Sequence, residues 1–199
     1  MQAHPELAGL LLAAGESSRL GEPKQLVTWH GKPLILSALE HALAVCGAGV
    51  TIVTGAYADQ VEAAVAGKPV SLLKNSEWQR GIGSSVRCGI TSIADTGARA
   101  TLMLLSDQPL VSTDDLAALV RLWTKDADQP VATCFADGNG VPAIFPERLF
   151  PALMGLPDHE GARGLLGDLP EDRLLRIPGA DLDIDTPDDL QQLLQNTSD

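Results

Sequence analysis

The sequence predicts an α/β domain with a central, mostly parallel β-sheet of about seven strands and one antiparallel element. Short apolar runs, typical of strands buried on both faces, alternate along the chain with segments of helical pattern. A hairpin pattern interrupts this alternation at residues 131–145. A chain of 199 residues is long enough for one well-filled core but too short for two, so we expect residues 1–199 to form a single domain.

The first half of the chain supplies the alternation of strands and helices. An apolar run at residues 10–13 predicts the first strand, and Val50–Thr54 and residues 70–73 predict the next two. Residues 33–43 and 57–66 have the composition and boundaries of helices that connect these strands. Such connections are right-handed crossovers, which place successive strands parallel to one another.

Ala100–Leu105 is the most apolar strand of the sequence, so we expect it at the centre of the sheet. Before it, Ser84 or Ser85 is suited to cap a helix that runs toward Ile93. After it, Thr113–Trp123 predicts a further helix, because capping residues precede its apolar positions. The alternation therefore continues on both sides of this strand.

A hairpin is predicted next. Val131–Phe135 and residues 140–145 flank a polar turn, and this pattern makes part of the sheet antiparallel. Pro142 has no backbone N–H and should lie at an edge or a bulge of the sheet. Residues 174–177 predict one more strand, and a last helix is expected to begin at residues 185–187, where a proline occupies the first turn.

The composition favours a globular cytoplasmic protein. No apolar run approaches the ~18–20 residues of a membrane span, and the first residues lack the pattern of a signal peptide. Cys46, Cys88 and Cys134 are odd in number and widely spaced, so we expect buried thiols in a reducing compartment. The net charge of −12 argues against binding nucleic acid or acidic membranes, and an anionic substrate must be held by local cations or a metal.

The stretch at residues 10–26 carries the clearest functional signal. Ala13, Ala14 and Gly15 follow the first strand, so a ligand could lie directly against backbone N–H groups that bind phosphate or a base edge. Arg19 and Lys24 add two cations that could reach a triphosphate. An ordinary polar loop is the alternative, but it would not need Ala-Ala-Gly at the strand exit. Neither a G-x-G-x-x-G fingerprint nor a Walker A loop is present.

Asp107 follows the expected central strand, and ligands gather beyond the carboxyl ends of strands in open parallel sheets. A carboxylate facing a phosphate-binding loop is a natural ligand for Mg²⁺. Asp107 could instead cap a turn before Pro109. Its position favours the metal ligand.

A second acidic segment lies near the end of the chain. Alternation places Asp181, Asp183 and Asp185 on one side of an extended stretch, where the carboxylates repel one another unless a cation joins them. Asp185 also begins the expected last helix. Both interpretations can hold, with Asp183 or Asp185 turned toward Asp107, and we therefore predict a metal site formed by Asp107, Asp183 and Asp185.

Residues 12–24 resemble the signature L-A-A-G-x-S-x-R-x-G-x-P-K of the nucleotidyltransferases that build and modify the molybdenum cofactor. Residues 75–89 resemble that family's N-x-x-W-x-x-G-x-x-S-S-x-x-x-G segment, and residues 157–166 resemble its G-D-x-G-A-R-x-L-L motif, with changes at the start of the motif. With the residues around Asp107 and the D-I-D-T-P-x-D-L stretch, five motifs occur in the family's order. The resemblance implies a three-layer Rossmann-like nucleotidyltransferase domain.

The resemblance also implies site residues. The nucleotide would be bound by Leu12, Ala13, Ala14, Gly15, Arg19, Lys24, Gly83, Ser84, Ser85 and Asp107. Of these, Arg19, Lys24 and Asp107 would be catalytic, with Mg²⁺ as cofactor. The phosphate-bearing acceptor would be bound by Gly140, Pro142, Gly161 and Arg163. A helix N-terminus beside two serine hydroxyls is independently a site for an anion or a polar base edge.

The implied reaction moves CMP from CTP onto a molybdopterin-type cofactor and releases pyrophosphate. The Ala13-Ala14 pair resembles the cytidylyl branch, whereas the guanylyl branch typically has Gly-Gly. Relatives that transfer cytidylate typically have Gly-His-Pro where this chain has Val141 between Gly140 and Pro142. The partner would be a molybdoenzyme or its chaperone. The alternatives are a sugar- or polyol-phosphate acceptor, or a non-catalytic nucleotide-binding partner of another enzyme.

Overall fold

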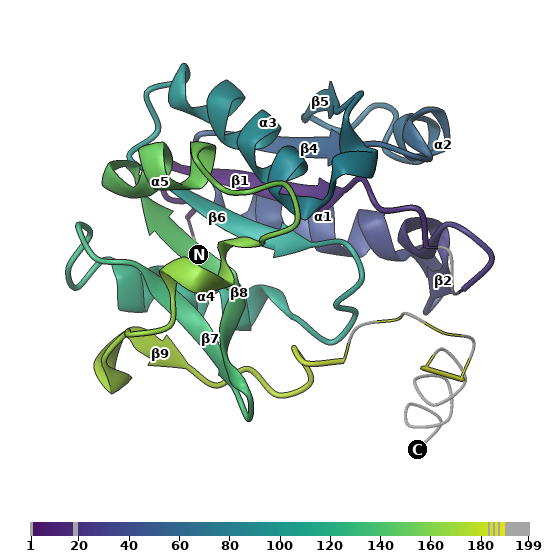
Figure 1. Ribbon diagram of the computed structural model, residues 1–199. Coiled ribbons are helices and arrows are strands. Elements are labelled where there is room, and N and C mark those ends of the chain that lie inside the picture. Colours follow the sequence, from purple (N-terminus) through teal and green to yellow (C-terminus); the bar gives the residue numbers. More distant parts are fainter. Residues whose placement is uncertain (1, 18–19, 183, 185, 187, 190–199) are drawn as a thin grey trace.

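The computed structural model describes residues 2–17, 20–182, 184, 186 and 188–189. Within this part of the chain, seven strands form one sheet in the order β5-β4-β1-β6-β8-β7-β9 (Figure 1). In that order the strands are β5 (Ser71–Lys74), β4 (Val50–Thr54), β1 (Leu7–Ala13), β6 (Ala100–Leu105), β8 (Gly138–Pro146), β7 (Val131–Phe135) and β9 (Leu174–Leu175). Two short strands, β2 (Thr28–Trp29) and β3 (Lys32–Pro33), pair separately.

Helical segments connect the described strands. The α-helices are α1 (Leu34–Val45), α2 (Ala58–Ala64), α3 (Ile82–Ala94), α4 (Thr113–Trp123) and α5 (Phe150–Met154). The 3₁₀ turns are η1 (Lys24–Leu26), η2 (Trp78–Arg80), η3 (Glu147–Leu149), η4 (Ala162–Leu165) and η5 (Glu171–Arg173).

The sheet is the middle of three layers (Figure 1). On one face, Leu11 of β1 belongs to a buried cluster with Leu39 of α1 and Leu116 of α4. On the other face, Leu10 belongs to a second cluster with Ile90 of α3. Neighbouring strand residues point to opposite faces, so the apolar run of β1 supplies both cores.

The predicted sheet is confirmed. β1 pairs in parallel with β4 and β6, β4 with β5, and β7 with β9, whereas β8 is antiparallel to both β6 and β7. β6 lies at the middle of the seven-strand order, as its apolar sequence predicts. In register, Leu12 is opposite Leu105, and Ala13 is opposite Thr54. The carboxyl ends of β1, β4 and β6 therefore meet at one edge.

Several predicted boundaries shift. β1 begins at Leu7, and β8 runs from Gly138 to Pro146, which shortens the hairpin turn. β9 covers Leu174 and Leu175 only. The predicted start of the last helix, including Asp185, lies partly outside the described residues.

The prediction that Ser84 or Ser85 caps α3 is wrong. The helix begins at Ile82, and its N-cap is Gly81, whose φ of 127° is costly for residues with a side chain. The Ser84 hydroxyl is already within the first turn, where it donates a hydrogen bond to the Gly81 carbonyl at 2.8 Å. The glycine turn, and not a serine cap, sets the start of this helix.

Pro142 lies at a bulge, not at an edge. β8 is an internal strand, but its pairing with β7 shifts between Ala132, which faces Ala143, and Thr133, which faces Gly140. Val141 and Pro142 of β8 fall within this irregularity. The hydrogen-bond ladder between β7 and β8 is already interrupted there, so the N–H that proline lacks is not needed for strand pairing.

The cysteines follow the prediction only in part. All three are free thiols, and Cys46 is buried, which raises its pKa to about 12. Cys88 on α3 and Cys134 near the end of β7 are partly exposed. Among the described residues, no helix is long and apolar enough to cross a membrane.

The capping box of α4 gives a testable measure of how firmly the helix after Asp107 is anchored. The Ser112 hydroxyl accepts a hydrogen bond from the Asp115 N–H, while the Asp115 carboxylate accepts one from the Ser112 N–H. Ser112→Ala should lower the free energy of unfolding by ~0.5–2 kcal/mol, measured by urea denaturation. Ser76→Ala, in an exposed loop, is the control. Equal stability of the two variants would contradict this role of the cap.

Candidate nucleotide-binding site

A cleft of about 410 Å³ opens where β1 and β6 end, and we call it the first cleft. Its walls come from the loop after β1, the η1 turn, the start of α3 and the residues after β6. The lining residues are Leu12, Ala13, Ala14, Gly15, Glu16, Lys24, Gln25, Trp78, Gln79, Gly81, Ile82, Ser85, Leu105, Ser106 and Asp107. The parallel register of β1 and β6 brings these segments together, although they are up to 95 residues apart in the chain, from Leu12 to Asp107.

Gln25 fastens the loop that follows β1. Its side chain is only 1% exposed, and its Nε2 donates to the carbonyls of Ala13 at 3.1 Å and Gly15 at 3.0 Å. The Ser17 hydroxyl accepts a hydrogen bond from the backbone N–H of Lys24 at 3.1 Å. These bonds close the loop on the η1 turn, so the backbone of the loop is held open toward the cleft.

The two charged groups predicted for this site are in direct contact. The Lys24 ammonium forms an ion pair with Oδ2 of Asp107, and their side chains are 20% and 6% exposed. The backbone carbonyl of Asp107 also accepts a hydrogen bond from the Ile184 N–H at 3.4 Å. A cation is thus already accommodated beside a nearly buried carboxylate at the strand end.

The structure places most predicted nucleotide-binding residues in the first cleft. Leu12, Ala13, Ala14, Gly15, Lys24, Ser85 and Asp107 all line it. Arg19, Asp183 and Asp185 lie outside the described residues.

Gly83 and Ser84 are not among the residues that line this cleft. Gly83 packs under the 157–160 segment, where a Cβ would lie 2.0 Å from the Pro157 carbonyl oxygen. The Ser84 hydroxyl accepts a hydrogen bond from Asn75 Nδ2 at 2.9 Å. Ser84 is only 4% exposed. Within this start of α3, Ser85 is the serine that lines the first cleft, and it too accepts a hydrogen bond from Asn75.

A second cleft of about 280 Å³ adjoins the first and shares Leu12, Ile82 and Leu105 with it. Of the residues predicted to bind the acceptor, Gly140, Gly161 and Arg163 line this second cleft. Its remaining lining residues are Val86, Met103, Gln108, Phe135, Asp137, Val141, Ala162, Ala180 and Asp181. Arg163 is exposed on its rim and pairs with Asp137 at 3.0 Å.

Pro142 is buried and is not among the residues that line the second cleft, and its carbonyl accepts a hydrogen bond from the Thr133 hydroxyl at 2.7 Å. Its neighbour Val141 lines the cleft instead. The valine that replaces the histidine of cytidylate-transferring relatives therefore faces the space where the acceptor is expected.

Two glutamines were not singled out by the sequence, although both lie in its functional stretches. Gln25 fastens the first loop, and Gln108 Nε2 donates to the carbonyls of Val141 at 3.2 Å and Ala180 at 2.7 Å. Their only sequence signal is their place beside Lys24 and Asp107. That position in the sequence does not indicate which backbone carbonyls accept the hydrogen bonds of each side-chain amide.

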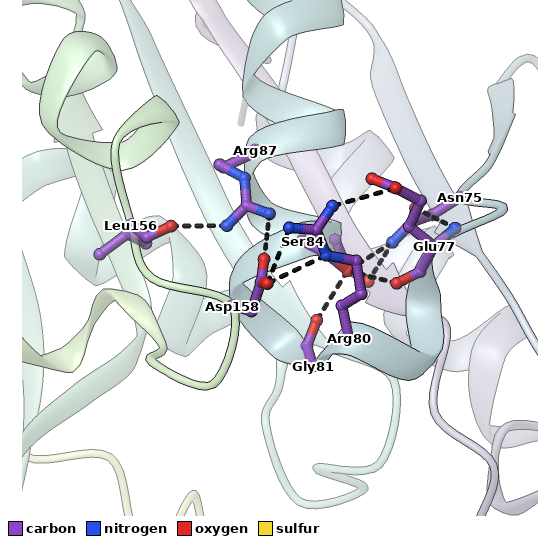
Figure 2. A network of polar contacts seen from close by, with 9 residues as sticks. Asn75, Glu77, Arg80, Gly81, Ser84, Arg87, Leu156 and Asp158 are labelled. Atoms are coloured by element: carbon purple, nitrogen blue, oxygen red, sulfur yellow. Dashed lines mark hydrogen bonds and ion pairs between the residues drawn. The ribbon is translucent and has the colours of Figure 1, made fainter.

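An ionic network ties α3 and the η2 turn before it to the segment at residues 156–158 (Figure 2). Asp158 pairs with Arg87 and, at 2.9 Å, with Arg80, and Arg87 also donates to the Leu156 carbonyl. The Arg87 hydrogen bond is the main cause that lowers the pKa of Asp158. The Gly83 N–H donates to the Asp158 carbonyl at 2.9 Å. The start of α3 and the segment that leads to Arg163 are therefore fixed to each other.

Of the three predicted metal ligands, Asp107 lies among the described residues, where it lines the first cleft. Among the described residues, no group of three His, Cys, Asp or Glu side chains is close enough to hold a metal. Asp107 faces the first cleft, and its contact with Ile184 brings that residue of the acidic segment beside it. Carboxylate oxygens are the ligands that Mg²⁺ uses. The assignment of Asp183 or Asp185 as further ligands stays a prediction, because both lie outside the described residues.

The sheet, its helices and the cleft at the carboxyl edge define a Rossmann-like nucleotidyltransferase domain. Residues 9–174 match the family model of the MobA-like NTP transferase domain, and the chain belongs to this family.

Two proteins similar to this chain carry names that refer to different functions. Purine catabolism protein PucB of Bacillus subtilis (strain 168) is 32% identical over 93% of this chain and 94% of its own length. A probable molybdenum cofactor guanylyltransferase of Rhodopirellula baltica is 30% identical over 77% of this chain and 69% of its own.

Among solved structures, Rv0371c from Mycobacterium tuberculosis H37Rv superposes with a TM-score of 0.78 at 27% identity, covering 96% of this chain and 98% of that one. A manganese complex of Rv0371C superposes with a TM-score of 0.77 at 26% identity, with the same coverage. A divalent cation is thus found bound to a structural relative.

Gln25→Glu tests whether the glutamine amide holds the nucleotide loop. The carboxylate keeps the shape of the side chain but cannot donate to the Ala13 and Gly15 carbonyls, which should cost ~1–3 kcal/mol of unfolding free energy in urea. The affinity for CTP, measured by calorimetry, should fall with it.

Gln79→Glu is the matched control, because it adds the same charge to an exposed side chain of the same cleft. If both variants keep wild-type stability and lose CTP affinity equally, the effect is one of charge, and the loop does not depend on Gln25.

Proposed function

We propose that this protein transfers CMP from CTP to a phosphate of a molybdopterin-type acceptor and releases pyrophosphate. The observation that carries the proposal is the pair of adjoining clefts. One contains Lys24 and Asp107 at the end of the central strands, and the other contains Arg163. A triphosphate in the first and a phosphate in the second would meet near their shared wall at Leu12, Ile82 and Leu105.

In the proposed reaction an oxygen of the acceptor phosphate attacks the α-phosphorus of CTP in line. A P–O bond to the acceptor forms, the bond between the α-phosphorus and its bridging oxygen breaks, and pyrophosphate leaves with that electron pair. Positioning and neutralisation of charge do most of the work in such transfers. Lys24 and Arg19 would hold the triphosphate, and Arg163 would orient the acceptor phosphate.

Asp107, with Asp183 or Asp185, would hold Mg²⁺. The bound cation would neutralise charge on the attacked phosphate and align it with the acceptor. The manganese bound by Rv0371C supports a divalent cation in the family, and the choice of Mg²⁺ is our proposal.

Ala13 and Ala14 support CTP as the donor, since both line the first cleft where the guanylyl branch typically has glycines. The relative named as a guanylyltransferase makes GTP the donor to compare. The identity of the acceptor is less constrained than that of the donor, because the Val141 side chain cannot form a hydrogen bond with a ligand in the second cleft. A sugar- or polyol-phosphate is therefore the alternative acceptor, and a molybdoenzyme or its chaperone is the partner that a molybdopterin product would imply.

Pyrophosphate release tests the proposal directly. The protein is incubated with Mg²⁺ and each nucleoside triphosphate, with and without molybdopterin. We expect release only with CTP and molybdopterin together. Release with sugar- or polyol-phosphates instead would replace the acceptor, and nucleotide binding without release under any condition would favour a non-catalytic binding partner.

Substitutions of the two cations test their assignment to the triphosphate. Lys24→Ala and Arg19→Ala should each weaken CTP binding by ~1.5–3 kcal/mol, roughly 10- to 100-fold, while cytidine binding changes little, because each removes a charge-assisted contact to phosphate. Calorimetry with both ligands gives the comparison. Lys32→Ala, whose amine pairs with Glu40 of α1, is the control. Equal losses for CTP and cytidine would remove these residues from the phosphate site.

The alanine pair can be tested for base selection. Replacing Ala13 and Ala14 by glycines adds backbone freedom and space at the loop, so the ratio of CTP to GTP turnover should fall toward one. The ratio is the proper readout, since both side chains are buried and their loss also lowers stability. An unchanged ratio would place the discrimination elsewhere, with Ser85 the next residue to test.

A further inference from the structure

The direct pairing of Lys24 with Asp107 has a consequence for the order in which ligands bind. The proposed function assigns the two side chains to different ligands, the triphosphate and the metal. In the structure they instead form an ion pair with each other in the lining of the first cleft. The triphosphate cannot contact the Lys24 ammonium fully, and the metal cannot bind the Asp107 carboxylate fully, until this ion pair opens.

The geometry makes the pair a strong barrier to a cation. The Lys24 ammonium contacts Oδ2 of Asp107, whose side chain is only 6% exposed, so water screens the pair weakly. A divalent cation that bound the same carboxylate would lie against a fixed positive charge. Glu16 is the other acidic residue among those described in the cleft lining, and it is exposed.

Lys24 is also placed to exchange partners. Its backbone is held by the Ser17 hydroxyl and lies next to the buried Gln25, so the position of the residue does not depend on its own ammonium group. The side chain has four rotatable carbons and a compact charge, which allow it to turn toward an incoming phosphate while its Cα stays in place.

We propose that Lys24 is an exchangeable counter-ion that keeps divalent metal off Asp107 until a nucleoside triphosphate draws the ammonium away. The inference rests on the proposed function for the identity of the triphosphate. It predicts weak metal binding by the nucleotide-free protein. It also predicts that metal and nucleotide strengthen each other by the same factor, as linkage requires. Part of that factor is the cost of opening the ion pair, which the two ligands share.

Titration of the nucleotide-free protein with Mn²⁺, followed by electron paramagnetic resonance of the free ion, tests the first half. Lys24→Met, of similar length but uncharged, should bind Mn²⁺ at least about 10-fold more tightly than wild type, corresponding to ~1.4 kcal/mol. Lys24→Arg should stay weak because it keeps the charge. Asp107→Asn added to Lys24→Met should abolish the gain, and Lys32→Met, which removes a lysine paired with Glu40, should leave Mn²⁺ affinity unchanged.

The second half is tested by repeating the titrations with saturating CTP and no acceptor. The bonds between Mn²⁺ and the phosphates are the same in both proteins, so the difference between their CTP-induced gains isolates Lys24. The gain should be at least about 10-fold smaller in Lys24→Met than in wild type.

Equal Mn²⁺ affinity of nucleotide-free wild type and Lys24→Met would overturn the inference, as would equal CTP-induced gains. Thermal unfolding of each variant confirms that the proteins compared are folded, and Lys24→Gln replaces Lys24→Met if that variant is not. No acceptor or turnover enters these measurements. Failure of pyrophosphate release would therefore sink the proposed function without touching the metal result, and the reverse also holds.

Discussion

The parallel pairing of β1 with β6 is the constraint on which the site depends. Leu12 lies opposite Leu105, so the two strands end together, and the residues that follow each strand share one edge of the sheet. The loop after β1 and Asp107 after β6 are brought within contact distance by backbone hydrogen bonds of the ladder, before any side chain of the site contributes. Because both strands are buried on both faces, a slip in their register would disrupt two cores at once.

Side-chain amides and one carboxylate turn this shared edge into a defined site. Gln25 fixes the loop after β1, Gln108 ties the residues after β6 to Val141 and Ala180, and Asp158 ties the start of α3 to the segment before Arg163. The Gln25 bonds close a local loop of 10 to 12 residues, whereas those of Gln108 and Asp158 join residues 33 to 78 positions apart. Together they hold in place the segments that line the two clefts, and a transfer between two bound substrates would depend on such positioning.

The two clefts differ in how closely their lining follows the sequence signatures described above. Residues 9–174 match the MobA-like NTP transferase family, and the first cleft is lined by Lys24, the small residues Ala13, Ala14 and Gly15, and Asp107 after β6. The second cleft is largely apolar, and Val141 removes a hydrogen-bonding group from its wall. If the second cleft binds the acceptor as proposed, its shape and the Arg163–Asp137 pair would select the acceptor, because no histidine stands at position 141.

The sequence by itself determined the class of fold, the central place of Ala100–Leu105 and the position of the hairpin, because apolar periodicity and local turn residues encode these features. The signature at residues 12–24 likewise predicted a loop that lines the first cleft, since its residues lie within one short segment. Only the tertiary structure decided that α3 starts at Ile82 with Gly81 as its N-cap, that the Ser84 hydroxyl is hydrogen-bonded by Asn75, and that Val141 lines the second cleft. It also decided the partners of Gln25, Gln108 and Lys24. The partner of a side chain depends on which other segment the fold places beside it. The local sequence around the residue does not encode which segments become neighbours in space.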